Sequence, residues 1–460
     1  MVTELKEVQI PVEELELGMH VVRLDRDWIE TDFLMQGFII NTPGDIDDLR
    51  RQCKFVFIEA RITTVPATPA GRSEAASPPR ERRREKQGLF ARLMDKPKPR
   101  PVVTARPAAG AGGPPSVDKK VTYINKINVQ AELAKSENTY TSAKITVKSI
   151  MSGIRLGRMI DMNQARETVN TIVDSVLRNK DALAWLTKIK EKDNYTAEHS
   201  LNVCILATAF ARHLGHDEED IRKIALSGLL HDVGKSRVPD DILNKEGRFD
   251  DQEFEIMKMH TVYGRDLLMS LSDADRVAID VAHSHHERID GKGYPRRLKE
   301  NQIPYFAKVV SLADCYDAIT STRCYDKGRA SMEALDIIYK CRGTQFDEHL
   351  ALEFIRCIGI YPPGSIVQFT NGEVGIVLAT DEQNKLKPKV LLVLDADKKR
   401  RQERVVDLMR GGKDMHGQPY SITQELANGT YGVDLQEYLR KGLVLKGASG
   451  EEAINGDKPK

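Results

Sequence analysis

The residues best suited to chemistry in this chain are imidazoles and carboxylates that fall between residues 199 and 314. The set consists of His199, His231, Asp232, His260, His285, His286 and Asp314. A lone pair such as His231-Asp232 more often ends a helix than binds a metal. Burying the whole set without a cation would leave costly unpaired polar groups. Taken together, these residues predict a metal centre.

The ligand types narrow the chemistry of that centre. No cysteine belongs to the set, which argues against a structural zinc cage. Mixed imidazole and carboxylate ligands suit iron, manganese and other first-row divalent ions. The candidates are more than one ion needs, which favours two ions bridged by a carboxylate. Two such ions can activate water and clamp a phosphodiester during in-line displacement.

Apolar residues at helical spacing must position these side chains. Ile221, Ile224 and Leu229 precede His231-Asp232 and place this dyad at a helix end beside the core. Apolar residues at the same spacing accompany His199, His260, His285 and Asp314. Each ligand-type residue therefore continues or flanks a face that would otherwise be core.

Three stretches of sequence resemble one family. His231-Asp-Val-Gly-Lys235 resembles the HDxGK motif of the HD superfamily of metal-dependent phosphohydrolases. His285-His-Glu-Arg-Ile-Asp-Gly-Lys-Gly-Tyr-Pro295, followed by Ile303-Pro304, resembles the extended signature of the HD-GYP subfamily. The segment from Ala313 to Tyr325 resembles the last characteristic block of that subfamily. The resemblance covers roughly residues 190–345, and the HHExxDGxGYP string is highly specific.

The resemblance implies a mainly α protein whose all-helical catalytic domain hydrolyses cyclic di-GMP. It implies that His199, His231, Asp232 and Asp314 hold one metal ion. Asp232 would bridge to a second ion held by His260, His285 and His286. Lys235 would act with Asp232 in catalysis by reaching the substrate phosphate and protonating the leaving oxygen. The expected substrate-binding residues besides Lys235 are Arg323, Tyr325 and Lys327.

The resemblance also implies a loop that gates the site or engages partner proteins such as GGDEF-type diguanylate cyclases. This loop contains Asp290, Gly291, Gly293, Tyr294 and Pro295.

Some family members hold a third metal with an acidic residue where this chain has Tyr195. We therefore expect two divalent ions, iron or manganese, and the linear dinucleotide pGpG as main product, with GMP as the further one.

The N-terminal part of the chain indicates a small α+β module over residues 1–64, similar to a module of unassigned function found before HD-GYP domains. Its expected strands are Val8–Val12, His20–Leu24, Gly37–Ile40 and Phe55–Ile62, with a helix over Asp45–Gln52. Residues 65–118 are rich in Pro, Ala and Arg, which is typical of a disordered linker. Residues 119–190 are amphipathic and predict a helical connector without motif-like chemistry.

The remaining boundaries follow from a change of period. Residues 191–360 form the expected catalytic domain, and residues 361–447 a small β-rich extension of the kind that usually follows it. In the extension, Asn371-Gly372 predicts a hairpin between strands Ser365–Thr370 and Glu373–Thr380, and Lys389–Leu394 is a further strand. Residues 448–460 are polar and predict a disordered tail.

Composition limits the location and the partners. The formal net charge of +1 provides no field that would favour DNA or an anionic membrane. No apolar run approaches the roughly 20 residues that span a bilayer, and the acidic start lacks the apolar core of a signal peptide. The cysteines form no CxxC pair, as expected in a reducing compartment. We expect a cytoplasmic protein, and the connector helices leave a homodimer open.

Two other functions remain open besides cyclic di-GMP hydrolysis. One is a catalytically weak sensor or scaffold that binds cyclic di-GMP or partner proteins. The other is a phosphodiesterase for a related cyclic dinucleotide. A missing ligand would have favoured the sensor, yet every expected ligand of a two-metal site is present.

Overall fold

The computed structural model describes residues 2–25, 38–40, 43–64, 120–189, 195–245, 247–321, 329–380 and 386–440. The chain divides into two compact units, Met1–Ala109 and Gly110–Lys460. The predicted linker and tail, and the predicted substrate-binding residues Arg323, Tyr325 and Lys327, lie outside the described residues. Within these ranges no helix combines the length and the apolar character that crossing a membrane requires.

The first unit is a small antiparallel sheet with one helix, as predicted. Its strands, in the order β1-β4-β2-β3, are β1 (Val2–Pro11), β4 (Phe55–Thr64), β2 (His20–Leu24) and β3 (Phe38–Ile39). The 3-10 helix η1 (Val12–Glu14) and α1 (Pro43–Gln52) connect them. The strand expected at Val8–Val12 instead begins at Val2, because β1 and β4 pair along their whole lengths, from Val2 with Thr64 to Pro11 with Phe55.

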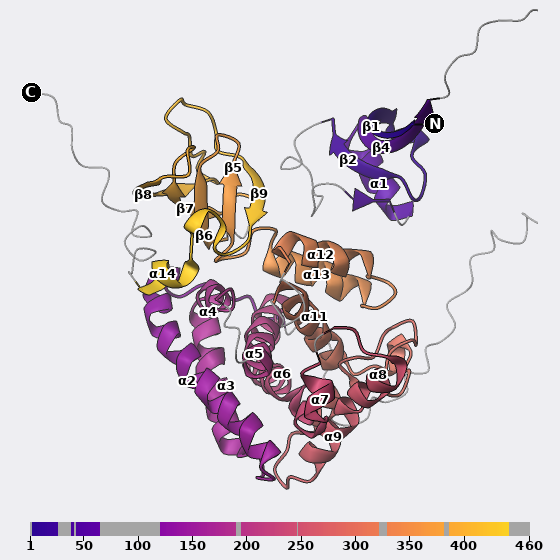
Figure 1. Ribbon diagram of the computed structural model, residues 1–460, viewed down its shortest axis with the longest axis vertical. Helices are drawn as coiled ribbons and strands as arrows, with labels where there is room; N and C mark the ends of the chain where they lie inside the picture. The colour runs from indigo at the N-terminus through magenta and orange to yellow at the C-terminus, as the bar shows by residue number, and fades with distance from the viewer. Residues whose placement is uncertain are drawn as a thin grey trace, which may run out of the picture. The chain divides into compact units, whose positions relative to one another are not determined.

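The second unit is mainly helical (Figure 1), which confirms the predicted fold class. Its longer helices are α2 (Val129–Arg155), α3 (Met162–Arg178), α5 (Tyr195–Leu214), α6 (Glu218–Leu230), α9 (His260–Met269), α10 (Arg276–Ser284), α11 (Tyr305–Thr320), α12 (Ser331–Lys340) and α13 (Glu348–Ile358). Shorter ones are α4 (Lys180–Leu186), α7 (Asp240–Leu243), α8 (Asp251–Lys258) and α14 (Leu435–Arg440), with 3-10 turns η5 (Val233–Arg237), η6 (Glu300–Gln302) and η7 (Thr430–Gly432).

Side-chain caps determine where several of these helices begin. An Asn or Asp accepts a hydrogen bond from a backbone N–H of the first turn, which is the usual signal for a helix start. The caps are Asn128 for α2, Asp161 for α3, Asp217 for α6, Asp250 for α8, Asp275 for α10 and Asp347 for α13. Local sequence therefore determines where these helices begin.

Helix α5 lies at the centre of the helical unit and packs against α6 and α11. Leu201, Ile205 and Phe210 of α5 are fully buried. Gly228 of α6 lies against the α5 backbone, since a Cβ at Gly228 would come within 3.1 Å of the Cys204 Cα atom. This close approach packs the C-terminal end of α6 against the middle of α5.

The C-terminal extension is a five-stranded antiparallel sheet with the order β8-β7-β6-β5-β9. Its strands are β5 (Ile366–Phe369), β6 (Val374–Ala379), β7 (Lys389–Leu394), β8 (Arg400–Asp407) and β9 (Ile422–Leu426). The predicted Asn371-Gly372 hairpin joins β5 to β6, with Gly372 at a φ of +85°. The sequence reading did not specify β8, which is highly charged, or β9 and α14.

Candidate metal centre

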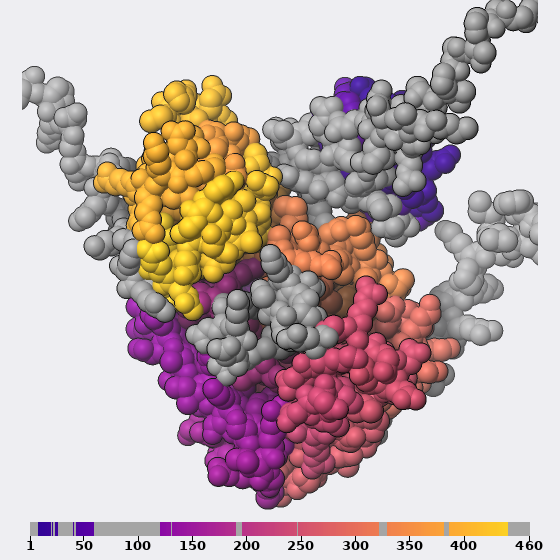
Figure 2. Space-filling model, in the orientation of Figure 1, coloured from indigo at the N-terminus to yellow at the C-terminus, as the bar shows by residue number. Residues whose placement is uncertain are grey.

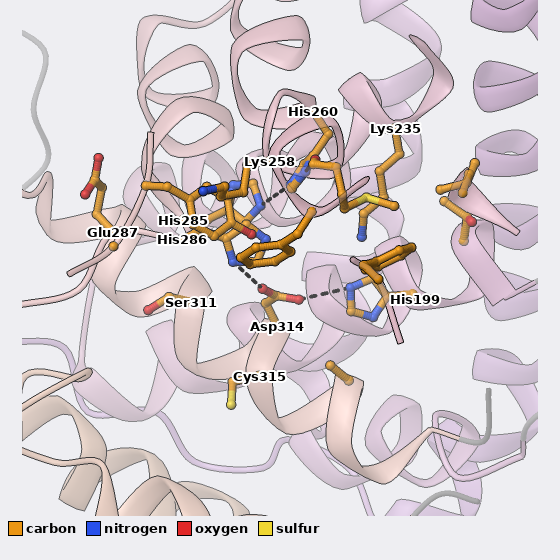
Figure 3. A pocket seen from close by; sticks show the side chains of 18 of the residues that line it. His199, Lys235, Lys258, His260, His285, His286, Glu287, Ser311, Asp314 and Cys315 are labelled. Carbon is orange, nitrogen blue, oxygen red and sulfur yellow. Dashed lines mark hydrogen bonds and ion pairs between the residues drawn. The ribbon is translucent and has the colours of Figure 1, made fainter. Parts of the chain in front are cut away.

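The seven predicted ligands converge from α5, α9 and α11 and from the residues that directly follow α6 and α10. Figure 3 shows five of them, His199, His260, His285, His286 and Asp314, gathered at one place. His199 lies in the first turns of α5, and Asp314 lies in α11. His231 caps the C-terminal end of α6, and His285 does the same for α10. Their ligand atoms fall into groups whose members lie within 4.8 Å of one another, namely His260 with His285 and His286, His199 with His231 and Asp314, and His231 with Asp232 and His285.

The Nδ1 atoms of four of these histidines have hydrogen-bond partners within the protein. His199 Nδ1 lies 2.8 Å from Asp317 Oδ2. The other three Nδ1 atoms donate to backbone carbonyls, at 2.8 Å from His231 to Gly228, 2.6 Å from His260 to Met257 and 3.1 Å from His285 to Val281. A carbonyl oxygen can only accept, so these three rings carry their proton on Nδ1. In its neutral form each of these rings therefore presents an unprotonated Nε2 atom to the centre, as a metal ligand does.

Asp232 lies between two groups of histidines, with one carboxylate oxygen toward each. Its Oδ1 atom is 3.4 Å from His260 Nε2 and 3.7 Å from His285 Nε2. Its Oδ2 atom is 3.2 Å from His231 Nε2 and 3.6 Å from His199 Nε2. The side chain is 1% exposed, so water cannot solvate this charge freely. Asp232 has the placement that a bridging carboxylate requires.

The donor set fits a divalent metal. Asp232 Oδ1 and His231 Nε2 are buried and lack a hydrogen-bond partner among the described residues. Leaving such atoms unpaired costs about 1–3 kcal/mol each. The neighbouring Nε2 atoms cannot relieve that cost by donating, because the bonds at Nδ1 determine their tautomers. A cation is the partner that satisfies both the lone pairs and the carboxylates.

Burial and nearby charges shift the pKa values of these histidines in opposite directions. Burial lowers the pKa of His260 to about 3, against the opposing charge of Asp232. Burial likewise lowers the pKa of His286 to about 4 and that of His285 well below its usual value. For His199, hydrogen bonds to Asp314 and Asp317 outweigh burial and raise the pKa to about 9. In the metal-free protein, His199 therefore holds a proton that a metal would replace.

The carboxylates remain charged in this environment. Burial raises the pKa of Asp232, but Lys235 and His231 outweigh it and hold that pKa well below its usual value. Burial also raises the pKa of Asp314, but the hydrogen bond from His199 and the charges of His231 and His286 outweigh it and hold that pKa well below its usual value. Lys235 extends from η5 so that its Nζ atom lies 2.5 Å from Asp232 Oδ2. The ammonium group thus sits at the edge of the cluster, where the pocket begins.

The predicted gating loop lies beside the cluster. Tyr294 covers His286, with ring centroids 4.8 Å apart, and its backbone N–H donates to the His286 carbonyl. Gly293 is required by this packing, because a Cβ there would lie 2.6 Å from His286 O and 2.5 Å from Glu287 Cα. Asp290 instead pairs with Arg288 on the outer side, at 2.8 Å. Of the loop, Gly293 and Tyr294 line the pocket.

A pocket of about 920 Å³ opens beside the metal cluster. Side chains that the sequence reading did not assign to the site also line it, including Lys148, Ser152 and Arg155 of α2 and Phe254 and Lys258 of α8. Figure 2 shows the surface of α2 and α3 meeting the surface of α7 to α9. Arg155 of α2 pairs with Asp240 of α7 at 3.5 Å. The amphipathic pattern of α2 carried no signal for this, because it does not say which neighbour a helix packs against.

Family models match most of the described chain. Residues 180–350 match the HD domain, and residues 7–165 match a domain of unknown function, DUF3391. The second match therefore runs beyond the N-terminal sheet and includes α2.

Known proteins are similar to this chain over most or part of its length. The chain is 33% identical over 410 residues to a cyclic di-GMP phosphodiesterase of Pseudomonas aeruginosa, a match that covers 88% of this chain and 90% of that protein. A cyclic di-GMP phosphodiesterase of Thermotoga maritima is 37% identical over 178 residues, with 38% and 48% covered. A 3'3'-cGAMP-specific phosphodiesterase of Vibrio cholerae is 31% identical over 194 residues, with 42% and 37% covered. The chain belongs to the HD-domain family of cyclic di-GMP phosphodiesterases.

Proposed function

We propose that this chain hydrolyses a phosphodiester bond of cyclic di-GMP at a metal centre held by its HD domain, lowering the level of that second messenger. The observation that carries the proposal is the position of Asp232, whose two carboxylate oxygens face separate groups of histidines. This arrangement supports a centre for two ions, as the ligand count in the sequence suggests. The likeness to the Pseudomonas aeruginosa enzyme along 88% of the chain supports the substrate.

The ligands divide between two ions as follows in this proposal. His199, His231, Asp314 and Asp232 Oδ2 would hold one ion. His260, His285, His286 and Asp232 Oδ1 would hold the other. Imidazole and carboxylate donors suit iron or manganese. When bound, such ions supply Lewis-acid charge that stabilises a phosphodiester undergoing in-line displacement.

Lys235 is the proposed general acid. Its Nζ atom lies 2.5 Å from Asp232, and the side chain is 21% exposed, so the ammonium is held by the cluster yet open to the pocket. A positioned ammonium can bind a non-bridging phosphate oxygen and protonate the departing oxygen. Asp232 orients Lys235 for this task, which gives this carboxylate a second role beside metal binding.

The pocket suits an anionic dinucleotide. Its volume of about 920 Å³ lies within the range of small-molecule sites, roughly 300–1,000 Å³. Cations from several elements line it, among them Lys148, Arg155, Lys258 and Arg297. Phe254 and Tyr294 stand edge to face with ring centroids 6.2 Å apart and provide an apolar wall for a base. These features support a substrate with two phosphates and two bases.

Finer features of the proposal come from the sequence. We propose two ions rather than three, because Tyr195 replaces an acidic residue, and the linear dinucleotide as main product. The loop of Asp290, Gly291, Gly293, Tyr294 and Pro295 would admit substrate or bind a GGDEF-type partner. Arg323, Tyr325 and Lys327, which are not among the described residues, would also contact the substrate.

The decisive experiment is turnover of cyclic di-GMP by the full chain loaded with manganese or iron, followed by chromatography of the products. The wild type should form the linear dinucleotide, and Asp232→Ala should lower kcat at least ~10³-fold because it removes a shared ligand and the partner of Lys235. Asp336→Asn, which removes a surface carboxylate paired with Lys340, should leave turnover unchanged.

The same assay separates the alternatives. A loaded wild type that leaves cyclic di-GMP intact would sink the proposal and favour the sensor. Faster turnover of 3'3'-cGAMP than of cyclic di-GMP would reassign the substrate to the class on which the Vibrio cholerae relative acts.

A further inference from the structure

A chain of hydrogen bonds joins helix α2 to the metal cluster. The Tyr140 hydroxyl of α2 lies 3.1 Å from Asn202 Oδ1 in α5. Asn202 Nδ2 donates to Asp317 Oδ1 at 3.1 Å. Asp317 Oδ2 in turn accepts from His199 Nδ1 at 2.8 Å. Three side chains thus connect a helix outside the predicted catalytic domain to a metal-ligand histidine.

The direction of each bond in this chain is determined by chemistry. A carboxylate only accepts, so Asn202 must present its NH₂ group to Asp317. The amide oxygen of Asn202 then faces α2, and the Tyr140 hydroxyl must donate to it. With Asp317 held, its other oxygen accepts the Nδ1 proton of His199, which leaves His199 Nε2 directed at Asp314 and Asp232. Reversing the Asn202 amide would turn an oxygen toward Asp317 and repel it.

The chain lies where such bonds matter most. Asn202 is fully buried, and Asp317 is 1% exposed. In a site of low dielectric constant, each bond is electrostatically stronger than in water, and a lost partner leaves a costly unpaired group. Ser321 also donates to Asp317 Oδ2, at 3.0 Å, so Asp317 is held from both sides. The orientation of His199 therefore depends on all of these partners.

A second contact fixes α2 at the same place. Lys144, one turn after Tyr140, forms an ion pair with Glu198 at 2.5 Å, and these side chains are 17% and 5% exposed. Glu198 directly precedes His199 in the chain. Helix α2 thus holds the first turns of α5 both through Lys144 and through Tyr140.

We propose that Tyr140 and Asn202 are positioning residues of the metal centre, through which α2 controls the orientation of His199. The proposal rests on the metal-binding role assigned to His199 above. It makes α2 part of the working site rather than a spacer between the N-terminal module and the HD domain. Outer partners of a ligand histidine typically change metal affinity by about 10–100-fold when removed. Tyr140 acts one bond further out, so we expect about 3–10-fold.

The test is metal affinity of the metal-stripped full chain, measured with Mn²⁺ in competition with a fluorescent chelator. Tyr140→Phe removes only the hydroxyl and should weaken Mn²⁺ binding by about 3–10-fold, with an unchanged Tm of the metal-free protein. In the turnover assay it should lower kcat more than it changes KM. Tyr123→Phe is the matched control, because the Tyr123 hydroxyl donates to the His216 carbonyl outside this chain of bonds. It should bind Mn²⁺ like the wild type.

A double-mutant cycle tests whether Tyr140 acts through Asn202. In an Asn202→Ala background, adding Tyr140→Phe should cause no further loss of affinity. Full additivity of the two losses, or wild-type affinity in Tyr140→Phe, would overturn the proposal. The Mn²⁺ titration needs no substrate, so a wild type that binds metal but leaves cyclic di-GMP intact would disprove the proposed function without touching this result.

Discussion

The Nε2 atoms of His260 and His285 face each other at 3.3 Å, although both rings already donate their Nδ1 proton to a backbone carbonyl. Two lone pairs therefore point at each other in a buried site. Without a cation this contact is repulsive, and with one it becomes a pair of ligands. The folded chain thus maintains a geometry that metal binding stabilises.

The first prediction is that metal stabilises the protein through this pair. Saturating the full chain with Mn²⁺ at about 100 times its Kd should raise the free energy of unfolding by about 2.7 kcal/mol. His285→Ala should abolish most of that gain, because it removes one ligand from the group of His260, His285 and His286. His213→Ala removes a histidine that pairs with Glu353 instead, at 2.9 Å, and should retain the gain. Calorimetry with and without Mn²⁺ measures the difference, and an equal gain in His285→Ala would contradict the prediction.

The second prediction concerns how many ions each group of histidines holds. Metal analysis of the wild type should find two ions per chain. His199→Ala and His260→Ala should each retain about one ion, because they belong to different groups that share only Asp232. Asp232→Ala should retain the least. A third ion in the wild type would show that Tyr195 does not limit the site to two.

The third prediction is a pH dependence of metal affinity. The pKa of His199 is raised to about 9 in the metal-free protein, where its Nε2 atom lies 3.0 Å from Asp314 Oδ1. Below this pKa the proton must leave before the metal binds, so affinity should fall by up to about tenfold per pH unit as pH drops from about 9. Mn²⁺ titrations across this range, with proton release followed by calorimetry in different buffers, check this. A pH-independent affinity would contradict it.

The same raised pKa has a consequence for stability without metal. A group whose pKa is higher in the folded than in the unfolded protein stabilises the fold while it is protonated in both. The contribution of His199 is therefore fully present below about pH 6.5 and is lost as pH rises through about 9. Addition of metal should remove this loss, because the metal then takes the place of the proton.

The fourth prediction concerns Gly234 in the His231-Asp-Val-Gly-Lys235 motif. A Cβ at this position would lie 1.9 Å from the His260 carbonyl oxygen and 2.4 Å from Gly264 N. Gly234→Ala must therefore push α9 and His260 away from the cluster. We expect a loss of about 1–3 kcal/mol of stability and a loss of Mn²⁺ affinity of at least about tenfold.

Gly153→Ala is the matched control for Gly234→Ala. Gly153 lies in α2, and its nearest neighbour would be Arg158 Cβ at 3.7 Å, which is ordinary contact. Alanine there should stabilise the helix by about 0.5–1 kcal/mol and leave Mn²⁺ binding unchanged. Urea unfolding and the Mn²⁺ titration check both variants, and wild-type affinity in Gly234→Ala would disprove the packing argument.

Much of the fold could be read from local signals. Helical spacing of apolar residues located the catalytic helices, and Asp217 and Asp275 cap α6 and α10, which end at His231 and His285. Asn371-Gly372 located the hairpin of the C-terminal sheet. β8 was missed because charge dominates its sequence, and its place depends on pairing with β7 rather than on its own pattern.

The sequence by itself determined which residues could bind metal, since the imidazole and carboxylate side chains and the HHExxDGxGYP motif are identified directly from it. Only the tertiary structure decided which atom of each ring faces the centre and that Asp232 faces both groups. The carbonyls of Gly228, Met257 and Val281, which determine the tautomers, acquire their positions from helix geometry. The role of α2 was equally hidden, because amphipathic spacing shows that one face is buried but not that Tyr140 meets Asn202. Such contacts join residues that lie 62 positions apart, and no local pattern encodes a distance across the fold.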